Sequence, residues 1–193
     1  MIAFSNVEFL TSALNKKGWP DCNLPEILMV GRSNVGKSST INSLLNNKKV
    51  AYVGKRPGKT RLLNFFAIDD KVILVDAPGY GFANRNYTEL INYGKMMDEY
   101  LLENKNLKLV IWILDIRRTP NEDDLLMFDW IINSKIPYLL LLNKVDKLSG
   151  NKRVKQIKLI SEKLKLKSED YLEYSAQTHK NREALKNIFE SII

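Results

Sequence analysis

Residues 31–38 read Gly-Arg-Ser-Asn-Val-Gly-Lys-Ser, which matches the phosphate-binding loop pattern Gly-x-x-x-x-Gly-Lys-Ser. Glycines in such a loop let backbone N–H groups turn inward, where they hold phosphate oxygens together with the positive end of the following helix. We expect Lys37 to reach the outer phosphates and the Ser38 hydroxyl to ligate a bridging Mg²⁺. The loop therefore predicts binding of a nucleoside triphosphate.

The segments on either side of the loop have the patterns that this motif requires. Residues 27–30 form a short apolar run that ends at a glycine, as a buried strand does, and residues 39–45 carry apolar side chains at helical spacing. The alternative is a glycine-rich turn that matches the pattern by chance. A strand before the loop and a helix after it argue against that alternative.

Two further segments contain residues suited to the magnesium ion and the terminal phosphate. Residues 54–61 are polar and without periodicity, so we expect a mobile loop in which Thr60 supplies a second hydroxyl ligand to Mg²⁺. Residues 62–68 and 71–75 predict an antiparallel hairpin, and the second strand runs into Asp76. Asp76 can hold a magnesium-bound water, and Gly79 can offer its N–H to the terminal phosphate.

The base-selecting residues are expected more than a hundred positions after the loop. Residues 136–142 predict a buried strand that ends in Asn143, Lys144, Val145 and Asp146. Because strand ends on one edge of a parallel sheet gather the ligand site, this tetrapeptide should lie near the phosphate loop. Asp146 can accept hydrogen bonds from the N1–H and the exocyclic amine of guanine, and adenine offers neither in that arrangement. This tetrapeptide therefore disfavours an ATP-dependent kinase. A short strand at 170–174 leads to Ser175, whose backbone can contact the guanine carbonyl.

The remaining pattern predicts mostly helices. Helices are expected at 88–104, at 151–167 and at 181–192, with a buried strand at 109–114 and a helix-like stretch at 7–14. A further helix should start at Thr119 as the capping residue, and its apolar face is expected to be Leu125, Phe128 and Ile132. His179, in the loop before the last helix, is not expected to be catalytic.

Composition limits the classes of protein that this chain can belong to. Its 193 residues suit one α/β domain, and a single cysteine excludes a disulfide framework. A net charge of +8 with 30 Lys and Arg suggests a polyanionic partner, RNA first. The lysine-rich face of the 151–167 helix is the best candidate surface for it. With no signal peptide or membrane span in its pattern, the chain is expected to be cytoplasmic, away from membranes and monomeric.

Taken in order, these motifs resemble those of the translation-factor-like small GTPases. More narrowly, residues 31–39, 56–60, 64–66, 75–81 and 114–118 resemble the EngB family, within the TrmE-Era-EngA-EngB-Septin-like group. The resemblance implies a Ras-like P-loop fold over residues 1–193, with residues 1–25 as an N-terminal extension that packs on the domain. The implied fold is α/β, a mainly parallel six-stranded sheet with one antiparallel strand and helices on both faces.

The resemblance also implies a function and a set of site residues. It implies a GTPase needed for assembly of the bacterial large (50S) ribosomal subunit, linked to cell division and septum formation, with ribosomal RNA and ribosomal proteins as partners. Lys37, Thr60 and Asn34 would be catalytic, and Ser38 and Thr60 would ligate Mg²⁺. Contacts to GTP or GDP would come from Gly31, Arg32, Ser33, Asn34, Val35, Gly36, Lys37, Ser38, Gly58, Lys59, Thr60, Arg61, Leu62, Asp76, Ala77, Pro78, Gly79, Asn143, Lys144, Val145, Asp146, Tyr174, Ser175 and Ala176.

Two departures from the wider GTPase pattern affect the expected activity. Gln177 stands where many GTPases have lysine, and Tyr80 stands where Ras-type enzymes have the glutamine that orients water. The missing lysine predicts modest nucleotide affinity. Because a tyrosine does not orient the attacking water as glutamine does, we expect slow intrinsic hydrolysis that an external factor accelerates. Asn34 is at the position that holds a potassium ion in related GTPases, so K⁺ is a candidate cofactor. The alternative function is a nucleotide-gated RNA- or protein-binding module with negligible turnover.

Overall fold

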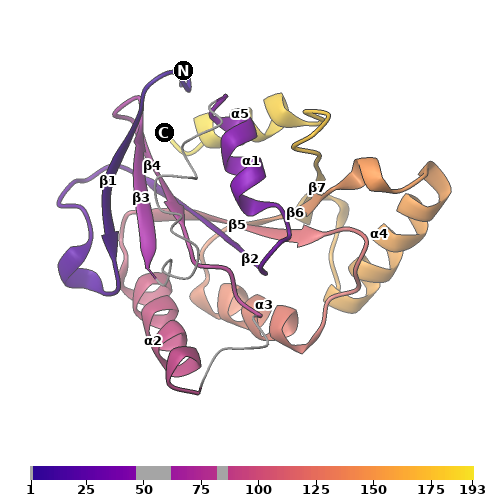
Figure 1. The fold of residues 1–193 in the computed structure, drawn as a ribbon, viewed down its shortest axis with the longest axis horizontal. Helices are drawn as coiled ribbons and strands as arrows, with labels where there is room; N and C mark the ends of the chain where they lie inside the picture. The colour runs from indigo at the N-terminus through magenta and orange to yellow at the C-terminus, as the bar shows by residue number, and fades with distance from the viewer. Residues whose placement is uncertain (1, 47–61, 82–86) are drawn as a thin grey trace.

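The computed structural model describes residues 2–46, 62–81 and 87–193. Within these residues one sheet is covered by helices on both faces (Figure 1). Its strands are β1 (Val7–Ala13), β2 (Glu26–Gly31), β3 (Leu63–Ile68), β4 (Val72–Asp76), β5 (Leu107–Asp115), β6 (Tyr138–Asn143) and β7 (Tyr171–Glu173). The helices are α1 (Lys37–Leu44), α2 (Tyr87–Glu103), α3 (Glu122–Ser134), α4 (Gly150–Leu164) and α5 (Arg182–Glu190), and short 3₁₀ turns occur at η1 (Lys16–Gly18), η3 (Val145–Lys147) and η4 (Ser168–Asp170).

The sheet is parallel except at β3. Its strand order is β1-β3-β4-β2-β5-β6-β7, with β2 paired in parallel to both β4 and β5. Only β3 runs against its neighbours, since both β1 and β4 pair with it antiparallel. The Ras-like α/β prediction with one antiparallel strand is confirmed. The described part of the sheet has seven strands rather than six because β1 joins its edge.

The helix expected at 7–14 was wrong, because this segment is the edge strand β1. It pairs with β3 from Val7 opposite Ile68 to Ala13 opposite Leu63, so the backbone groups that face β3 are hydrogen-bonded to it. The ring of Phe9 packs edge-on to that of Phe66 at 5.6 Å between centroids. Pairing to an existing strand outweighs the weak local helical spacing. Leu14, expected to pack on the domain, keeps 46% of its surface exposed.

Two apolar cores lie on opposite faces of the sheet. One core joins β-strand side chains such as Trp112 to α2, α3 and α4, and the other joins β-strand side chains such as Ile111 to α1 and α5. Figure 1 shows α1 and α5 above the sheet and α2 and α3 below it. The central strands β2 and β5 are consequently apolar at nearly every position, as parallel strands covered on both faces must be.

The N-cap of helix α3 lies two residues after the expected one. Asn121, not Thr119, caps the helix: its side chain accepts from the N–H of Asp124, whose carboxylate accepts from the N–H of Asn121. The Asn121–Asp124 pair is a capping box, which satisfies two N–H groups at once and therefore defines the helix start. Ile132, expected inside, is 46% exposed, whereas Met127 and Ile131 are buried.

Helix α4 is amphipathic as predicted, although its apolar stripe is shorter than expected. Ile160 and Leu164 are buried, whereas Val154, near the start of the helix, is 66% exposed. No helix in the described ranges 2–46, 62–81 and 87–193 has the length and apolarity needed to cross a bilayer.

Candidate nucleotide site

The phosphate-binding loop joins the end of β2 to the start of α1, at the carboxyl edge of the sheet (Figure 1). Gly36 caps α1 with a left-handed φ of 98°, and a Cβ at this position would collide with the side chain of Asn143. A Cβ on Gly31 would lie 2.8 Å from the carbonyl oxygen of Ile113. Both glycines are therefore required for the turn. The loop directs the N-terminus of α1 toward the edge where a phosphate group fits.

Asp76 ends β4 next to the loop and pairs with its lysine. The Lys37 Nζ donates to the Asp76 carboxylate, and each side chain is only 11% exposed. An outer phosphate of a bound nucleotide would compete with Asp76 for this ammonium group. Ser38, the next residue of α1, and Asp76 both supply oxygen donors, and oxygen is the ligand that Mg²⁺ prefers. The donor set therefore fits Mg²⁺.

The segment after Asp76 lies directly on the loop. The Ser33 N–H donates to the Tyr80 carbonyl at 3.0 Å, and the Tyr80 N–H donates to the Gly31 carbonyl at 3.3 Å. The Ser33 hydroxyl also donates to the Tyr80 carbonyl at 3.2 Å. A Cβ added to Gly79 would come within 2.8 Å of that hydroxyl oxygen. Gly79 therefore permits a close approach of two backbones, and the backbone of Tyr80 is hydrogen-bonded directly to the loop.

The side chain of Tyr80 points into the core rather than toward the phosphate loop. It is 5% exposed, and its hydroxyl donates to the Asp124 carboxylate at 2.8 Å and accepts from the Trp112 indole N–H at 2.8 Å. Burial, with the negative charge of Asp124 beside it, raises the pKa of Tyr80 far above its usual range. In this conformation the hydroxyl links Trp112 of β5 to Asp124 of α3. The sequence position revealed no sign of this network.

The residues at the end of β6 brace the phosphate loop. The Asn143 amide donates to the Val35 carbonyl at 2.9 Å, and the Lys144 ammonium donates to the Asn34 carbonyl at 2.6 Å. These pairs are 108 and 110 positions apart in the sequence. The prediction that this tetrapeptide lies beside the loop is confirmed. The segment expected to bind the base is therefore hydrogen-bonded directly to the phosphate loop.

Asp146 lies in η3, where hydroxyl and ammonium groups surround its carboxylate. The Ser175 hydroxyl donates to Asp146 at 2.6 Å, and the Lys147 ammonium lies 3.1 Å from the other carboxylate oxygen. The hydrogen bond from Ser175 is the main reason that the pKa of Asp146 is lowered. Lys147 also donates to the Gln177 amide oxygen at 2.8 Å. An ammonium group thus stands at this end of the site although residue 177 is glutamine.

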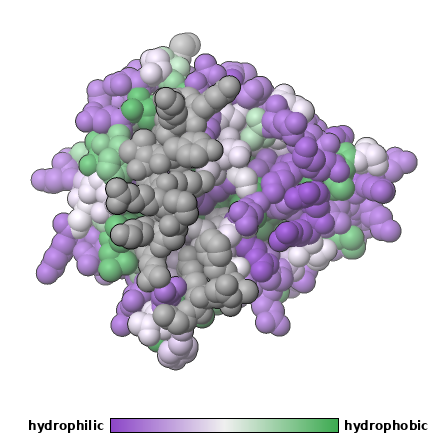
Figure 2. All heavy atoms as spheres, viewed as in Figure 1, coloured by the Kyte–Doolittle hydropathy of each residue, from purple (hydrophilic) through white to green (hydrophobic). Residues whose placement is uncertain are grey.

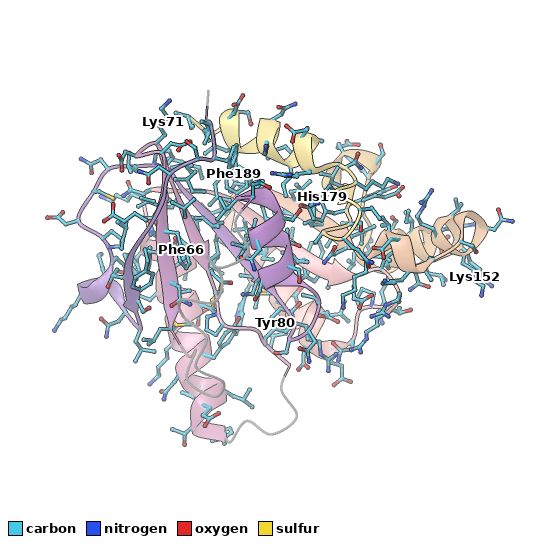
Figure 3. The ribbon with its side chains drawn as sticks, turned by 45° about the horizontal axis from the view of Figure 1, so that its top comes forward. Phe66, Lys71, Tyr80, Lys152, His179 and Phe189 are labelled. Atoms are coloured by element: carbon cyan, nitrogen blue, oxygen red, sulfur yellow. The ribbon has the colours of Figure 1, made fainter. Side chains whose placement is uncertain are left out.

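A second hydrogen-bonded chain, which sequence reasoning missed, ties the 174–176 segment to α1. The Tyr174 hydroxyl donates to the Ser43 hydroxyl at 3.1 Å, and Ser43 lies 3.0 Å from the Nδ1 of His179. Ser43 and Tyr174 are buried, and His179 is in the loop before α5, as predicted (Figure 3). These contacts anchor the base-binding end to the helix that follows the phosphate loop.

The described site residues fall into three groups at one edge of the sheet. The phosphate loop, the Asp76 to Gly79 segment and the base-binding segments converge there through the contacts above. Leu62 directly precedes β3. Four expected contact residues, Gly58, Lys59, Thr60 and Arg61, lie outside the described residues. The second Mg²⁺ ligand and the mobile loop around Thr60 therefore stay predictions.

Comparison with protein families gives a match over most of the site. Residues 26–144 match a family described as 50S ribosome-binding GTPase. The chain is 49% identical over 168 residues to a protein named "Probable GTP-binding protein EngB" from Mesoplasma florum, covering 86% of this chain and 85% of that protein. A protein of the same name from Desulforamulus reducens is 43% identical over 188 residues, covering 96% and 92%.

Solved structures have the same architecture. The crystal structure of a probable GTP-binding protein EngB superposes with a TM-score of 0.72 at 27% identity, covering 86% of this chain and 98% of that one. The structure of Era from Aquifex aeolicus superposes with a TM-score of 0.63 at 19% identity, covering 88% and 57%, and shows likeness of fold alone.

Proposed function

Since this chain belongs to the EngB family of GTP-binding proteins, we propose that it is a slow, partner-stimulated GTPase that acts in assembly of the large ribosomal subunit. Guanine nucleotide binding and GTP hydrolysis follow from the family itself. One observation carries the site assignment within this chain. The segment that contains Asp146 is hydrogen-bonded directly to the phosphate loop through Lys144.

Guanine selection is assigned to Asp146. Like an ordinary aspartate, it is ionised at neutral pH, and the Ser175 hydrogen bond lowers its pKa further. An ionised carboxylate accepts from both the N1–H and the exocyclic amine of guanine. Replacing Asp146 with Asn should weaken the binding of GDP and strengthen the binding of xanthosine diphosphate. Fluorescent-nucleotide titration would measure both affinities, with Asp129→Asn on the exposed side of α3 as the control. Unchanged base preference in Asp146→Asn would refute the assignment.

In the proposed hydrolysis, Lys37 and the loop N–H groups would bind the phosphates, Ser38 would ligate Mg²⁺, and Asp76 would hold a water bound to that ion. When bound, that ion neutralises charge on the outer phosphates. Burial of the Tyr80 side chain supports a slow intrinsic rate, because no glutamine occupies this position and the tyrosine hydroxyl is engaged with Asp124. External stimulation is the expected consequence.

Potassium stimulation through Asn34 is the part of the proposal that solution kinetics tests most directly. Asn34 has a left-handed φ of 65°, its carbonyl accepts from Lys144, and the residue is exposed. Single-turnover hydrolysis should be faster in K⁺ than in Na⁺, and Asn34→Ala should remove the difference. Equal rates in both salts for the unaltered protein would refute the potassium proposal.

The large subunit or its precursor is the proposed partner. The matched family is described as 50S ribosome-binding, and the net charge of +8 favours a polyanion. Helix α4 and the residues that follow it contribute a run of cationic side chains, Lys152, Arg153, Lys155, Lys158, Lys163, Lys165 and Lys167. Hydrophilic residues predominate around this helix in Figure 2, and Lys152 projects from its outer side in Figure 3. We propose this surface as the site of contact with RNA.

Co-sedimentation with purified large subunits and their precursors tests this partner. Binding should be strong with a non-hydrolysable GTP analogue, weak with GDP, and reduced as salt is raised. Replacing Lys152, Lys155 and Lys158 together with glutamate should weaken binding to the particles. The matched control replaces three exposed lysines outside α4 with glutamate, namely Lys17, Lys105 and Lys108. This control should weaken binding to the particles much less. Equal loss in the two triple variants would contradict a specific role for α4.

The second candidate function is a nucleotide-gated RNA- or protein-binding module whose turnover is negligible. The observation that favours it is the engagement of Tyr80 in the core, which leaves the position of the water-orienting glutamine without a polar group facing the loop. Single-turnover rates with and without ribosomal particles separate the two functions. Stimulation supports the assembly GTPase, and no stimulation supports the module.

The cellular setting completes the proposal. We place the protein in the cytoplasm as a monomer, where ribosomal subunits are assembled. The link to cell division and septum formation stays a prediction, and depletion of the protein followed by microscopy and subunit profiling tests it. A division defect without any subunit defect would contradict the assembly role.

A further inference from the structure

Asp115, the last residue of β5, has its carboxylate enclosed by four donors. Its side chain is 3% exposed. The Arg117 backbone N–H and Nε donate to Oδ1 at 3.1 and 2.9 Å, and the Arg117 Nη2 donates to Oδ2 at 2.7 Å. The Lys144 Nζ also donates to Oδ2, at 2.9 Å. Two cationic side chains therefore share one buried carboxylate.

Lys144 is the residue through which this cluster reaches the nucleotide site. Its ammonium group is shared between the Asp115 carboxylate and the Asn34 carbonyl of the phosphate loop, the latter at 2.6 Å. Its backbone has a left-handed φ of 67°, a conformation that non-glycine residues keep only when their surroundings impose it. Its Cε would lie 3.5 Å from a Cβ on Gly36. The stem of Lys144 therefore lies along the loop with its tip tied at two points.

Stability alone is a weak reason for burying this carboxylate. A buried ion pair repays its desolvation cost only when its geometry is excellent, and an apolar replacement is often as stable. Here one partner of Asp115, Lys144, also donates to the phosphate loop. The other partner, Arg117, also interacts electrostatically with Asp146.

We propose that Asp115 and Arg117 are positioning residues for the guanine nucleotide, which act by holding Lys144 against the phosphate loop. Asp115 fixes the Lys144 ammonium, and the two-pronged contact from Arg117 fixes the carboxylate. Without Asp115, the Lys144 and Arg117 cations would face each other, and the lysine would leave the loop carbonyl. This inference deepens the nucleotide site on which the proposed function rests.

The first experiment is titration of Asp115→Asn with fluorescent GDP and with a non-hydrolysable fluorescent GTP analogue. Asparagine has the same shape but cannot balance two cations, so the affinity should fall by about ten- to a hundredfold, as for loss of a hydrogen bond to a charged group. The loss should be equal for the two nucleotides, because Lys144 contacts Asp115 and the Asn34 carbonyl and not Lys37 or Gly79, the residues assigned to the terminal phosphate. In steady-state hydrolysis KM should rise while kcat changes little.

A double-mutant cycle with Lys144→Ala separates positioning from a general structural role. If Asp115 acts through Lys144, Asp115→Asn should cost less than about twofold in affinity once Lys144 is absent. Additive losses would overturn the proposal. Arg117→Lys keeps the positive charge but cannot donate to both carboxylate oxygens as the guanidinium does, so it should give an intermediate loss of nucleotide affinity. Arg118→Ala, at the exposed neighbouring arginine, should leave the affinity unchanged.

Thermal unfolding monitored by circular dichroism accompanies each titration, and Asp115→Glu serves as a second variant if Asp115→Asn does not fold. Failure of the unaltered protein to bind GDP would remove the proposed function itself. Normal GDP binding by the unaltered protein together with undiminished binding by folded Asp115→Asn would overturn only the positioning role.

Discussion

Replacing Tyr80 with Phe tests whether its hydroxyl stabilises the core or takes part in hydrolysis at the terminal phosphate. The change removes one oxygen that donates to Asp124 and accepts from Trp112, both at 2.8 Å. The Trp112 side chain is fully buried, so its indole N–H would lose its partner without gaining water. A hydrogen bond to a charged group contributes about 1.5–3 kcal/mol, so we expect a loss of about 2 kcal/mol in the free energy of unfolding.

For a chain of this size, 1 kcal/mol corresponds to about 2–4 °C in Tm, so Tyr80→Phe should melt about 4–8 °C lower. Urea unfolding should show a lower midpoint with an unchanged slope, because the folded surface is the same. Tyr87→Phe is the matched control, since that tyrosine on α2 is 79% exposed and its hydroxyl faces solvent. The control should leave Tm unchanged.

The same variant should hydrolyse GTP at the rate of the unaltered protein in single-turnover assays. The hydroxyl is directed away from the phosphate loop and has no geometry for contact with an attacking water. A tenfold fall in hydrolysis with an unchanged Tm would refute this reasoning. It would mean that Tyr80 leaves the core in the working state and that its buried position is not the one used in catalysis.

Three other changes test separate parts of the structure. Burial raises the pKa of the Glu26 carboxyl in the folded state, so the unfolded state binds fewer protons and the free energy of unfolding falls as pH rises above the ordinary pKa of a glutamate. Glu26→Gln should abolish that fall in urea titrations at several pH values. A fall that persists in Glu26→Gln would contradict this reasoning. Asn121→Ala removes the cap from α3 and should cost about 1 kcal/mol in unfolding free energy, whereas a neutral result would mean that Asp124 alone defines the helix start. Gly79→Ala brings a Cβ within 3.2 Å of the Ser33 backbone, so it should lower the ratio of GTP-analogue affinity to GDP affinity by about fivefold or more. An unchanged ratio would show that Gly79 does not contribute to binding of the terminal phosphate.

Short motifs with strict local geometry were predictable from the sequence alone. The phosphate loop was predicted because its glycines are required by backbone conformation: Gly36 has a φ that side chains disfavour, and Gly31 has no room for a Cβ. The hairpin of β3 and β4 was predictable from its polar turn at Asp69 and Asp70, both of which have positive φ. In these cases the chemical identity of a few neighbouring residues limits the backbone to one arrangement.

The segment at Asn143 was also predicted to meet the loop, for a topological reason. Parallel strands bring their carboxyl ends to one edge of a sheet, so the ends of two strands far apart in the sequence can lie close together, as those of β2 and β6 do on either side of β5. The contacts from Asn143 to Val35 and from Lys144 to Asn34 are instances of that rule. The sequence thus determined which segments form the site.

Only the tertiary structure decided how individual side chains within those segments are used. Tyr80 reads as a catalytic-loop residue in sequence, yet its hydroxyl is buried because Asp124 of α3 and Trp112 of β5 meet there. The segment that contains Phe9 has helical spacing, yet it is a strand because β3 offers an unpaired edge. Asp115 bonds to Lys144, 29 positions away. Such partners are brought together by packing across elements, and local sequence carries no signal of which donor will meet which acceptor.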